Sequence, residues 1–384
     1  MQDFLYMLIL LAFALGWFLR SRSASGNPLL RLSSSTRAHY FQGLNYLINQ
    51  EPDKAIATLS RLIEVDPDAI ELQLALGALF RQRGELDRAI DLHQSLLSRR
   101  NLTPAHQHQA LSALAHDYLS AGVLDRAERL FKELVSFKAQ KKESLNALLL
   151  IYQQEKDWGK AISVAALLLK LGIPMRSVIA HCHCEQAVIL LKKSNWAQSQ
   201  VHLNKALRAD PQSIRVALLT AKVHVKAGRY RDAMHCYQRV IARDVRYMRE
   251  VVRPILLCAQ HLSCLDDVMM GIQEQLRNRL SVRLGLVIYH ELSQVLSEKV
   301  ASDFFLGLFD QKMALPGIGE VLQLCLQHPG ADSEKILIRF QATLSHWLAA
   351  SAVYRCTHCG LDTKTLFWLC PGCHRWDAIT PQHV

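Results

Sequence analysis

The sequence predicts an all-α protein: a superhelical solenoid of two-helix repeats, preceded by one transmembrane helix and followed by a small metal-binding knuckle. Three features lead to this prediction. They are an uncharged apolar run at the N-terminus, small and aromatic residues that recur every 34 positions, and two cysteine pairs near the C-terminus. At 384 residues the chain is too long for one growing core. Half of its residues are hydrophobic but only 7% are aromatic, which favours helices over a sheet sandwich.

The first element is the apolar run from Phe4 to Leu19, which is followed by Arg20 and Arg22. Its 16 residues would span about 24 Å as a helix, somewhat less than the hydrocarbon core of about 30 Å. Positive charges on the C-terminal flank alone place that flank in the cytoplasm. Residues 1–20 are therefore predicted to be a single-pass membrane anchor, with the bulk of the chain on the cytoplasmic side.

A secretory signal peptide is the alternative for this run, because Ala12-Phe13-Ala14 has the small-x-small form of a cleavage site. No Lys or Arg precedes the run, however, and cleavage there would leave only a short hydrophobic region. An uncleaved anchor is the favoured interpretation. The Ser-rich residues 21–35 have no helical period and are predicted to be a linker.

The central element, residues 36–245, has a period of 34 residues, which is the tetratricopeptide period. A small residue is needed where the two helices of a unit cross, and a large one beside it fills the gap. The positions that carry the period are Gly43, Tyr46, Ala55, Gly77, Phe80, Ala89, Ala115, Tyr118, Ala127, Tyr152 and Ala161. The aromatic residues among them are predicted to be core. Residues 246–350 keep an apolar spacing of three and four and are predicted to be degenerate helical repeats, with Pro254 and Pro316 near helix starts.

Such an array is typical of proteins that bind protein segments along a concave face. No Walker loop or nucleophile elbow is present, and His290-Glu291 lacks the second histidine of a zincin motif, so an enzyme is not expected. The formal charge of +11 suits an acidic partner or an anionic membrane surface. Without a dense basic tract and stacking aromatics, nucleic acid is not an expected partner.

A second group of potential metal ligands, His181-Cys182-His183-Cys184, lies within predicted helix. Successive side chains on a helix point about 100° apart, so these four cannot converge on one ion. They are predicted to be ordinary helix residues.

The last element, residues 351–384, carries two Cys-x-x-Cys pairs that are ten residues apart. The predicted metal ligands are Cys356, Cys359, Cys370 and Cys373, because each pair can form a tight turn that aims two thiolates at one ion. A sulfur-only tetrahedral site suits iron or zinc, and the spacing does not separate the two. One ion would fold a tail that has no core of its own. A rubredoxin-like redox module is the functional alternative.

Between and beside the cysteine pairs, residues 365–369 have strand-like composition. Phe367, Trp368 and Trp376 are expected to cover the ion, since so short a segment offers little else to shield it.

The tail also carries a more specific set of residues: Tyr354, Arg355, Cys356, Cys359, Gly360, Phe367, Trp368, Cys370, Pro371, Cys373, Trp376, Ile379 and Pro381. With the anchor and the repeats, these resemble the lipopolysaccharide assembly protein B family of Gram-negative bacteria. Leu361 and Asp362 depart from the pattern expected of that family.

The resemblance implies an inner-membrane adaptor that regulates lipopolysaccharide synthesis. Its cytoplasmic repeats would hold the deacetylase of the lipid A pathway and present it to a membrane-bound ATP-dependent zinc protease. An inner-membrane regulator that senses lipopolysaccharide would be a further partner. The resemblance also implies a rubredoxin-type site with one iron per chain on the four cysteines, packed on the repeats, with zinc as the alternative metal. A scaffold that gathers lipopolysaccharide-synthesis enzymes stays open as the alternative function, and a homo-oligomer stays open as well.

Overall fold

The computed structural model describes residues 42–43, 45–46, 49, 51–65, 69–100, 102–276, 282–309, 338–339, 342 and 353–382. The predicted anchor and linker, residues 1–35, lie outside these ranges, and so does Pro316. Within the described ranges, every helix is too short or too polar to cross a bilayer.

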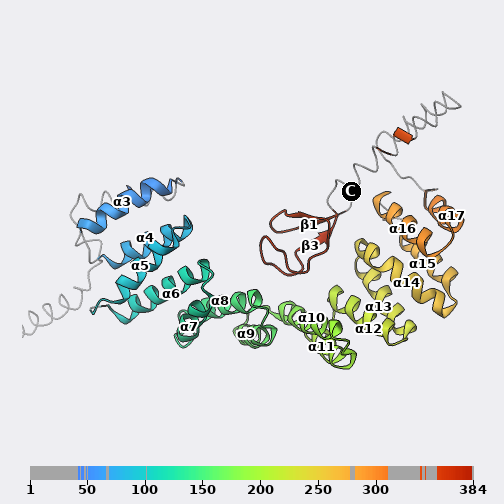
Figure 1. The fold of residues 1–384 in the computed structure, drawn as a ribbon, viewed down its shortest axis with the longest axis horizontal. Coiled ribbons are helices and arrows are strands. Elements are labelled where there is room, and N and C mark those ends of the chain that lie inside the picture. The colour runs from blue at the N-terminus through green and yellow to red at the C-terminus, as the bar shows by residue number, and fades with distance from the viewer. Residues whose placement is uncertain are drawn as a thin grey trace, which may run out of the picture. The chain divides into compact units, whose positions relative to one another are not determined.

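Helices make up nearly all of the described chain up to residue 309 (Figure 1). They are α3 (Pro52–Val65), α4 (Ile70–Gln82), α5 (Leu86–Leu97), α6 (Pro104–Ser120), α7 (Leu124–Leu134), α8 (Lys141–Gln154), α9 (Trp158–Lys170), α10 (Arg176–Lys192), α11 (Trp196–Ala209), α12 (Ile214–Lys226), α13 (Tyr230–Arg243), the 3-10 turn η2 (Val245–Tyr247), α14 (Met248–Leu262), α15 (Leu265–Leu276), α16 (Val282–Val295) and α17 (Glu298–Phe309). The chain divides into two compact units, Met1–Ile151 and Tyr152–Val384.

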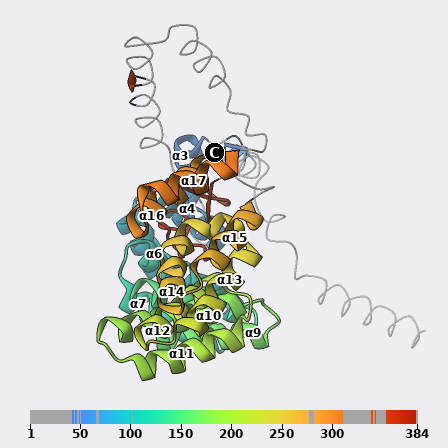
Figure 2. The same cartoon turned by 90° about the vertical axis from the view of Figure 1, so that its right-hand side faces the viewer.

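Within each unit, neighbouring helices pack in pairs. In the first unit α4 packs on α5 and α6 on α7, and in the second α10 packs on α11, α12 on α13 and α16 on α17. The first helices of consecutive pairs also touch one another, as α4 touches α6 and α10 touches α12. Figure 2 shows the resulting stack of α10 to α17. The predicted tetratricopeptide solenoid is therefore confirmed for the described helices.

The residues that carry the period form the core. Those that are fully buried are Ala55, Ala89, Ala115, Ala127 and Ala161. Phe80, Tyr118 and Tyr152 are buried as well, and Tyr46 packs against the core of the first unit. The prediction that the periodic aromatic residues are core is confirmed.

The turns inside the pairs share one backbone feature. Gly84 and Gly228 end α4 and α12 with φ of 79° and 71°, and the residue after each glycine donates its N–H back into the helix. This is the left-handed helix end that glycine adopts without strain. Lys156 and Ser194 take the same conformation after α8 and α10, with φ of 58° and 56°, although they have side chains. The repeat therefore continues through turns that carry no glycine signal in the sequence.

Pro254 is a correction to the sequence analysis. It lies inside α14 and not near its start. The helix begins at Met248, because η2 leads directly into it, and it continues past the residue that lacks an N–H donor. Several apolar residues of α14, among them Val251, Ile255 and Leu256, are fully or almost fully buried, and their burial holds the helix together across the proline.

The C-terminal knuckle is a three-stranded antiparallel sheet in the order β2-β1-β3, formed by β1 (Tyr354–Cys356), β2 (Asp362–Thr363) and β3 (Ile379–Pro381). The prediction of a strand at 365–369 is wrong, because in this segment only Leu369 forms a β-bridge, which pairs it with Trp376. The chain bends through this segment because it must bring Cys370 back to the first cysteine pair.

Candidate metal centre

The structure brings the four predicted cysteines together. Their Sγ atoms all lie within 4.8 Å of one another. The Sγ atoms of Cys356 and Cys373 are 3.7 Å apart, and so are those of Cys359 and Cys370. These separations are far longer than a disulfide bond. Four sulfurs placed about 2.3 Å from one ion would lie about 3.8 Å from each other in a regular tetrahedron. The donor set therefore fits a single iron or zinc ion, and its geometry does not choose between them.

Two matching turns aim the thiolates. The N–H of Gly360 donates to the carbonyl of Cys356 at 3.0 Å, and the N–H of His374 donates to the carbonyl of Cys370 at 2.9 Å. Gly360 and His374 both have positive φ, 76° and 53°. The Cys359 N–H also points at the Cys356 sulfur and, as the largest cause, lowers the pKa of that thiol to about 6. This hydrogen bond favours the thiolate of Cys356, the form that ligates a metal, whereas burial raises the pKa of the Cys373 thiol to about 12.

The knuckle has a very small core of its own. Its buried residues are Tyr354, Cys356, Cys370, Ala378 and Ile379, so two of the five are metal ligands. So few apolar side chains cannot offset the entropy of ordering the segment. An iron or zinc ion held by Cys356, Cys359, Cys370 and Cys373 would therefore stabilise the knuckle in this shape.

Trp376 and Asp377 of the knuckle dock on the repeats of the second unit. The Trp376 ring stacks on His181 of α10, with ring centroids 4.6 Å apart and an interplanar angle of 9°. It also meets the ring of Trp158 edge to face at 6.2 Å. The Asp377 carboxylate accepts hydrogen bonds from His181 Nε2 at 2.7 Å and from Ser177 Oγ at 2.9 Å.

Arg215 of α12 also takes part in this contact, because it lies next to His181. Its side chain is only 7% exposed, and it donates to Glu185 at 2.5 Å. Its Nη1 lies 3.4 Å from Nδ1 of His181. Because a guanidinium only donates, Nδ1 accepts and the ring proton is on Nε2, from where it is donated to Asp377. Burial would raise the pKa of Asp377, but the hydrogen bonds from His181 and Ser177 and the charge of Arg215 outweigh it and lower the pKa.

A second contact lies further along the repeats. The Trp368 ring stacks on Tyr247 of η2 at 6.1 Å, and the Tyr354 hydroxyl donates to Glu250 of α14. The expectation that the aromatic residues cover the ion needs correction. The rings of Trp368 and Trp376 lie against the repeats, and Phe367 is 43% exposed. The apolar surface of the neighbouring helices attracts them more strongly than the small knuckle can.

Comparison with known proteins agrees with this geometry. A family model described as "Rubredoxin metal binding domain" matches residues 354–381, and models described as "Tetratricopeptide repeat" match residues 40–101 and 190–251. Lipopolysaccharide assembly protein B of Escherichia coli (strain K12) is 30% identical over 384 residues, covering 99% of this chain and 98% of the relative. This chain belongs to the lipopolysaccharide assembly protein B family.

A further relative and a solved structure are also similar to this chain. The member of this family from Haemophilus influenzae is 29% identical over 400 residues, again covering 99% of this chain and 98% of the relative. Among solved structures, a tetratricopeptide repeat protein from Parabacteroides merdae aligns with 72% of this chain and 99% of its own at 17% identity, with a TM-score of 0.37. In the present chain, the four cysteines form a metal-binding knuckle.

His181 is the functional residue that the sequence analysis missed. The sequence predicts ordinary helix residues from His181 to Cys184, and all four do lie in α10. The Cys182 and Cys184 thiols are fully buried, and burial raises the pKa of each to about 12. His181, however, is the main contact of the knuckle. The available signal was its position, 34 residues before Arg215 and therefore at the same place in the repeat.

The two residues of the incomplete zincin motif lie close to other side chains of the repeats. His290 and Glu291 lie on α16, where His290 Nε2 is 2.9 Å from Gln294 Nε2 and Glu291 Oε2 is 3.9 Å from Arg253 Nε. Neither side chain is aimed at the cysteine cluster, the only group of three or more potential metal ligands among the residues that the structure describes.

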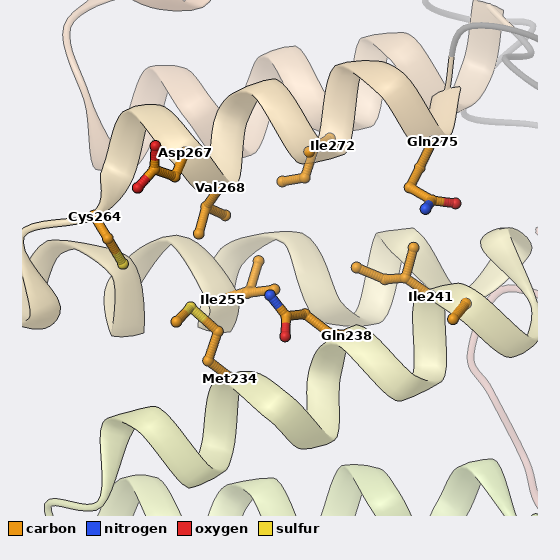
Figure 3. A pocket seen from close by; sticks show the side chains of 11 residues that line it. Met234, Gln238, Ile241, Ile255, Cys264, Asp267, Val268, Ile272 and Gln275 are labelled. Atoms are coloured by element: carbon orange, nitrogen blue, oxygen red, sulfur yellow. The ribbon is translucent and has the colours of Figure 1, made fainter.

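A cavity of about 440 Å³ lies between α13, α14 and α15 (Figure 3). Its lining is mostly aliphatic, with Met234, Ile255 and Ile272 among the residues that Figure 3 labels. A Cβ atom added to Gly271 would meet nothing within 4 Å, so this side of the cavity is open. Such a lining suits an apolar side chain of a bound protein better than it suits chemistry.

Proposed function

We propose that this protein is an inner-membrane adaptor that regulates lipopolysaccharide synthesis by bringing the deacetylase of the lipid A pathway to a membrane-bound ATP-dependent zinc protease. The observation that carries the proposal is the match over nearly the whole chain to relatives named lipopolysaccharide assembly protein B. An inner-membrane regulator that senses lipopolysaccharide would adjust the rate of delivery.

The repeats support an adaptor and not an enzyme. A solenoid built from stacked helix pairs offers an extended surface for protein segments. In the first unit, the first helices of consecutive pairs, α4 and α6, pack side by side and together form part of such a surface. These surfaces bind and orient a partner without carrying out a reaction.

Residues 1–20 would confine the adaptor to the membrane that contains the protease. Tethering raises the effective concentration of two partners, so weak contacts with each of them suffice. In this proposal the repeats lie on the cytoplasmic side, where they hold the deacetylase.

The knuckle has a structural part in the proposal. Bound iron or zinc would hold Cys356, Cys359, Cys370 and Cys373 and so fix the surface that docks on α10 and α12. An iron ion would in addition supply one-electron chemistry, which is the basis of the redox alternative. The extensive packing of the knuckle on the repeats favours the structural role.

Depletion of the protein tests the proposal. We expect the deacetylase half-life and the lipopolysaccharide content of the cells to rise, and re-expression of the intact chain to restore both. A chain that lacks residues 1–20 should fold but fail to restore them. An unchanged deacetylase half-life on depletion would refute the proposal and favour a scaffold that gathers lipopolysaccharide-synthesis enzymes. Co-purification of several such enzymes with the intact chain would then identify the scaffold.

A further inference from the structure

The contact between knuckle and repeats has the form of a peptide bound to a receptor. Two consecutive knuckle residues, Trp376 and Asp377, supply an aromatic ring and a carboxylate. The receptor groups are Trp158, Ser177 and His181, which come from α9 and α10. The ligand and the receptor are far apart in the chain, since Asp377 lies 196 positions after His181.

The receptor side is built without help from the knuckle. Arg215 is fixed by Glu185, and it reaches Nδ1 of His181, which sets the tautomer of that ring. All three residues belong to α10 and α12, whose packing is part of the solenoid. The donors for a carboxylate and the aromatic wall beside them would therefore keep their places if the knuckle left.

The ligand side, in contrast, depends on the metal. Asp377 has a positive φ of 54°, and its N–H donates to the carbonyl of Trp368 at 3.0 Å. Trp376 is held by a bridge to Leu369, the residue before the metal ligand Cys370. When the ion is lost, these restraints go with it, because the ligands make up much of the knuckle core.

Trp376 leaves one of its polar groups without a partner in the docked position. The indole N–H of Trp376 is buried and has no hydrogen-bond partner among the described residues. Leaving a buried donor unpaired is unfavourable. Another aromatic side chain without that donor, such as phenylalanine, could fill the same place without this penalty.

We propose that Trp158, Ser177, His181 and Arg215 form a binding site for a partner segment in which an aromatic residue directly precedes an acidic one, and that the metal-bound knuckle blocks this site. The ring of the segment lies against His181 and Trp158, and its carboxylate accepts from His181 and Ser177 near the charge of Arg215. Loss of the ion frees the site. The protein thereby couples its metal content to the binding of a second partner, whatever the partners of the other repeats are.

A labelled peptide tests the proposal on the full-length chain in detergent. The probe has the sequence of residues 374–382, and its binding is followed by fluorescence anisotropy with the metal-loaded chain, with the chain stripped by a chelator under reducing conditions, and with the reloaded chain. Each state is also measured for a chain that carries Trp376→Ala and Asp377→Asn, because the unchanged chain keeps its own tethered copy of the probe sequence after stripping. We expect binding to the stripped chain and at least about tenfold weaker binding to the loaded and reloaded chains, because the tethered knuckle competes at a high effective concentration. Helical circular dichroism confirms that the repeats stay folded after stripping.

Matched variants locate the site. Arg215→Gln in the stripped chain, and Asp377→Asn in the peptide, should each weaken binding about tenfold, since each removes a charged partner. Arg208→Gln, the same change at an exposed position of α11, should leave binding unchanged. The proposal is wrong if the peptide binds the loaded and stripped chains equally, if it binds neither, or if Arg215→Gln and Arg208→Gln have the same effect.

Discussion

Two helix glycines should respond in opposite ways to the same substitution. Gly77 lies inside α4 and Gly271 inside α15. Replacement of an interior helix glycine by alanine normally stabilises the helix by about 1 kcal/mol. A Cβ atom at 271 would meet nothing within 4 Å, so Gly271→Ala should show this full gain. A Cβ atom at 77 would overlap the ring of His93. Two ring atoms would lie closer than Cδ2, and even Cδ2 would be only 3.1 Å from the added Cβ.

The His93 ring cannot easily move aside. Its Nδ1 lies 2.5 Å from Asp117 Oδ2, and Asp117 in turn accepts from Arg81 at 2.7 Å. His93 and Asp117 are fully buried. Overpacking in such a place costs about 1–3 kcal/mol. After the gain in helix propensity, Gly77→Ala should destabilise α4 by up to about 2 kcal/mol, and it should differ from Gly271→Ala by about 1–3 kcal/mol.

Native-state hydrogen exchange of the α4 and α15 amides is the suitable assay, because the two units need not unfold together. The double variant Gly77→Ala, His93→Ala provides the internal control. Its coupling energy should be of the size of the overlap, about 1–3 kcal/mol. If Gly77→Ala protects α4 as much as Gly271→Ala protects α15, the close packing of His93 on Gly77 is refuted.

Three further outcomes are expected at the knuckle. Cys370→Ser combined with Cys373→Ser should remove the one bound ion per chain, measured by elemental analysis, and unchanged metal content would show that the ligands are wrong. Trp376→Ala should weaken docking by about 2–4 kcal/mol, the sum of two ring contacts and one cation–π contact, whereas the exposed Phe367→Ala should change it by less than about 0.5 kcal/mol. Limited proteolysis of the knuckle compares these two variants. Because the pKa of Asp377 is lowered in the folded chain, its contribution is complete above its unfolded pKa of about 3.9 and is lost as the pH falls through the lower folded value. Acid titration of tryptophan fluorescence should show this loss, and Asp377→Asn should remove that step.

Features that follow from residue spacing could be predicted from the sequence. Small residues such as Ala55 and Ala89 are needed wherever two helices cross, so their spacing of 34 identifies the repeat before any packing is known. The same holds for the cysteine pairs, because two residues between cysteines suffice to form the turn that aims both thiolates. Both features depend on neighbours in the chain, and both appear in the structure where the spacing places them.

Other local signals were ambiguous. The left-handed turns at Lys156 and Ser194 carry side chains and so lack the glycine that marks Gly84. Pro254 is a residue type that often stands at a helix start, yet α14 continues through it. Burial of apolar residues on both sides of Pro254 stabilises the helix by more than the one missing backbone hydrogen bond costs. At Pro254, tertiary packing overrides the preference of the single residue, whereas local backbone hydrogen bonds close the exposed turns at Lys156 and Ser194.

The place where the knuckle docks could not be predicted from the sequence. His181 and Asp377 are 196 residues apart, and no spacing rule relates a histidine in a helix to an aspartate beyond a cysteine pair. The contact arises because stacked repeats bring His181 of α10 and Arg215 of α12 to the same face, where a folded knuckle can present Trp376 and Asp377 together. Side chains that meet through the packing of separate elements leave no periodic trace in the sequence, and for that reason this contact could be found only in the folded chain.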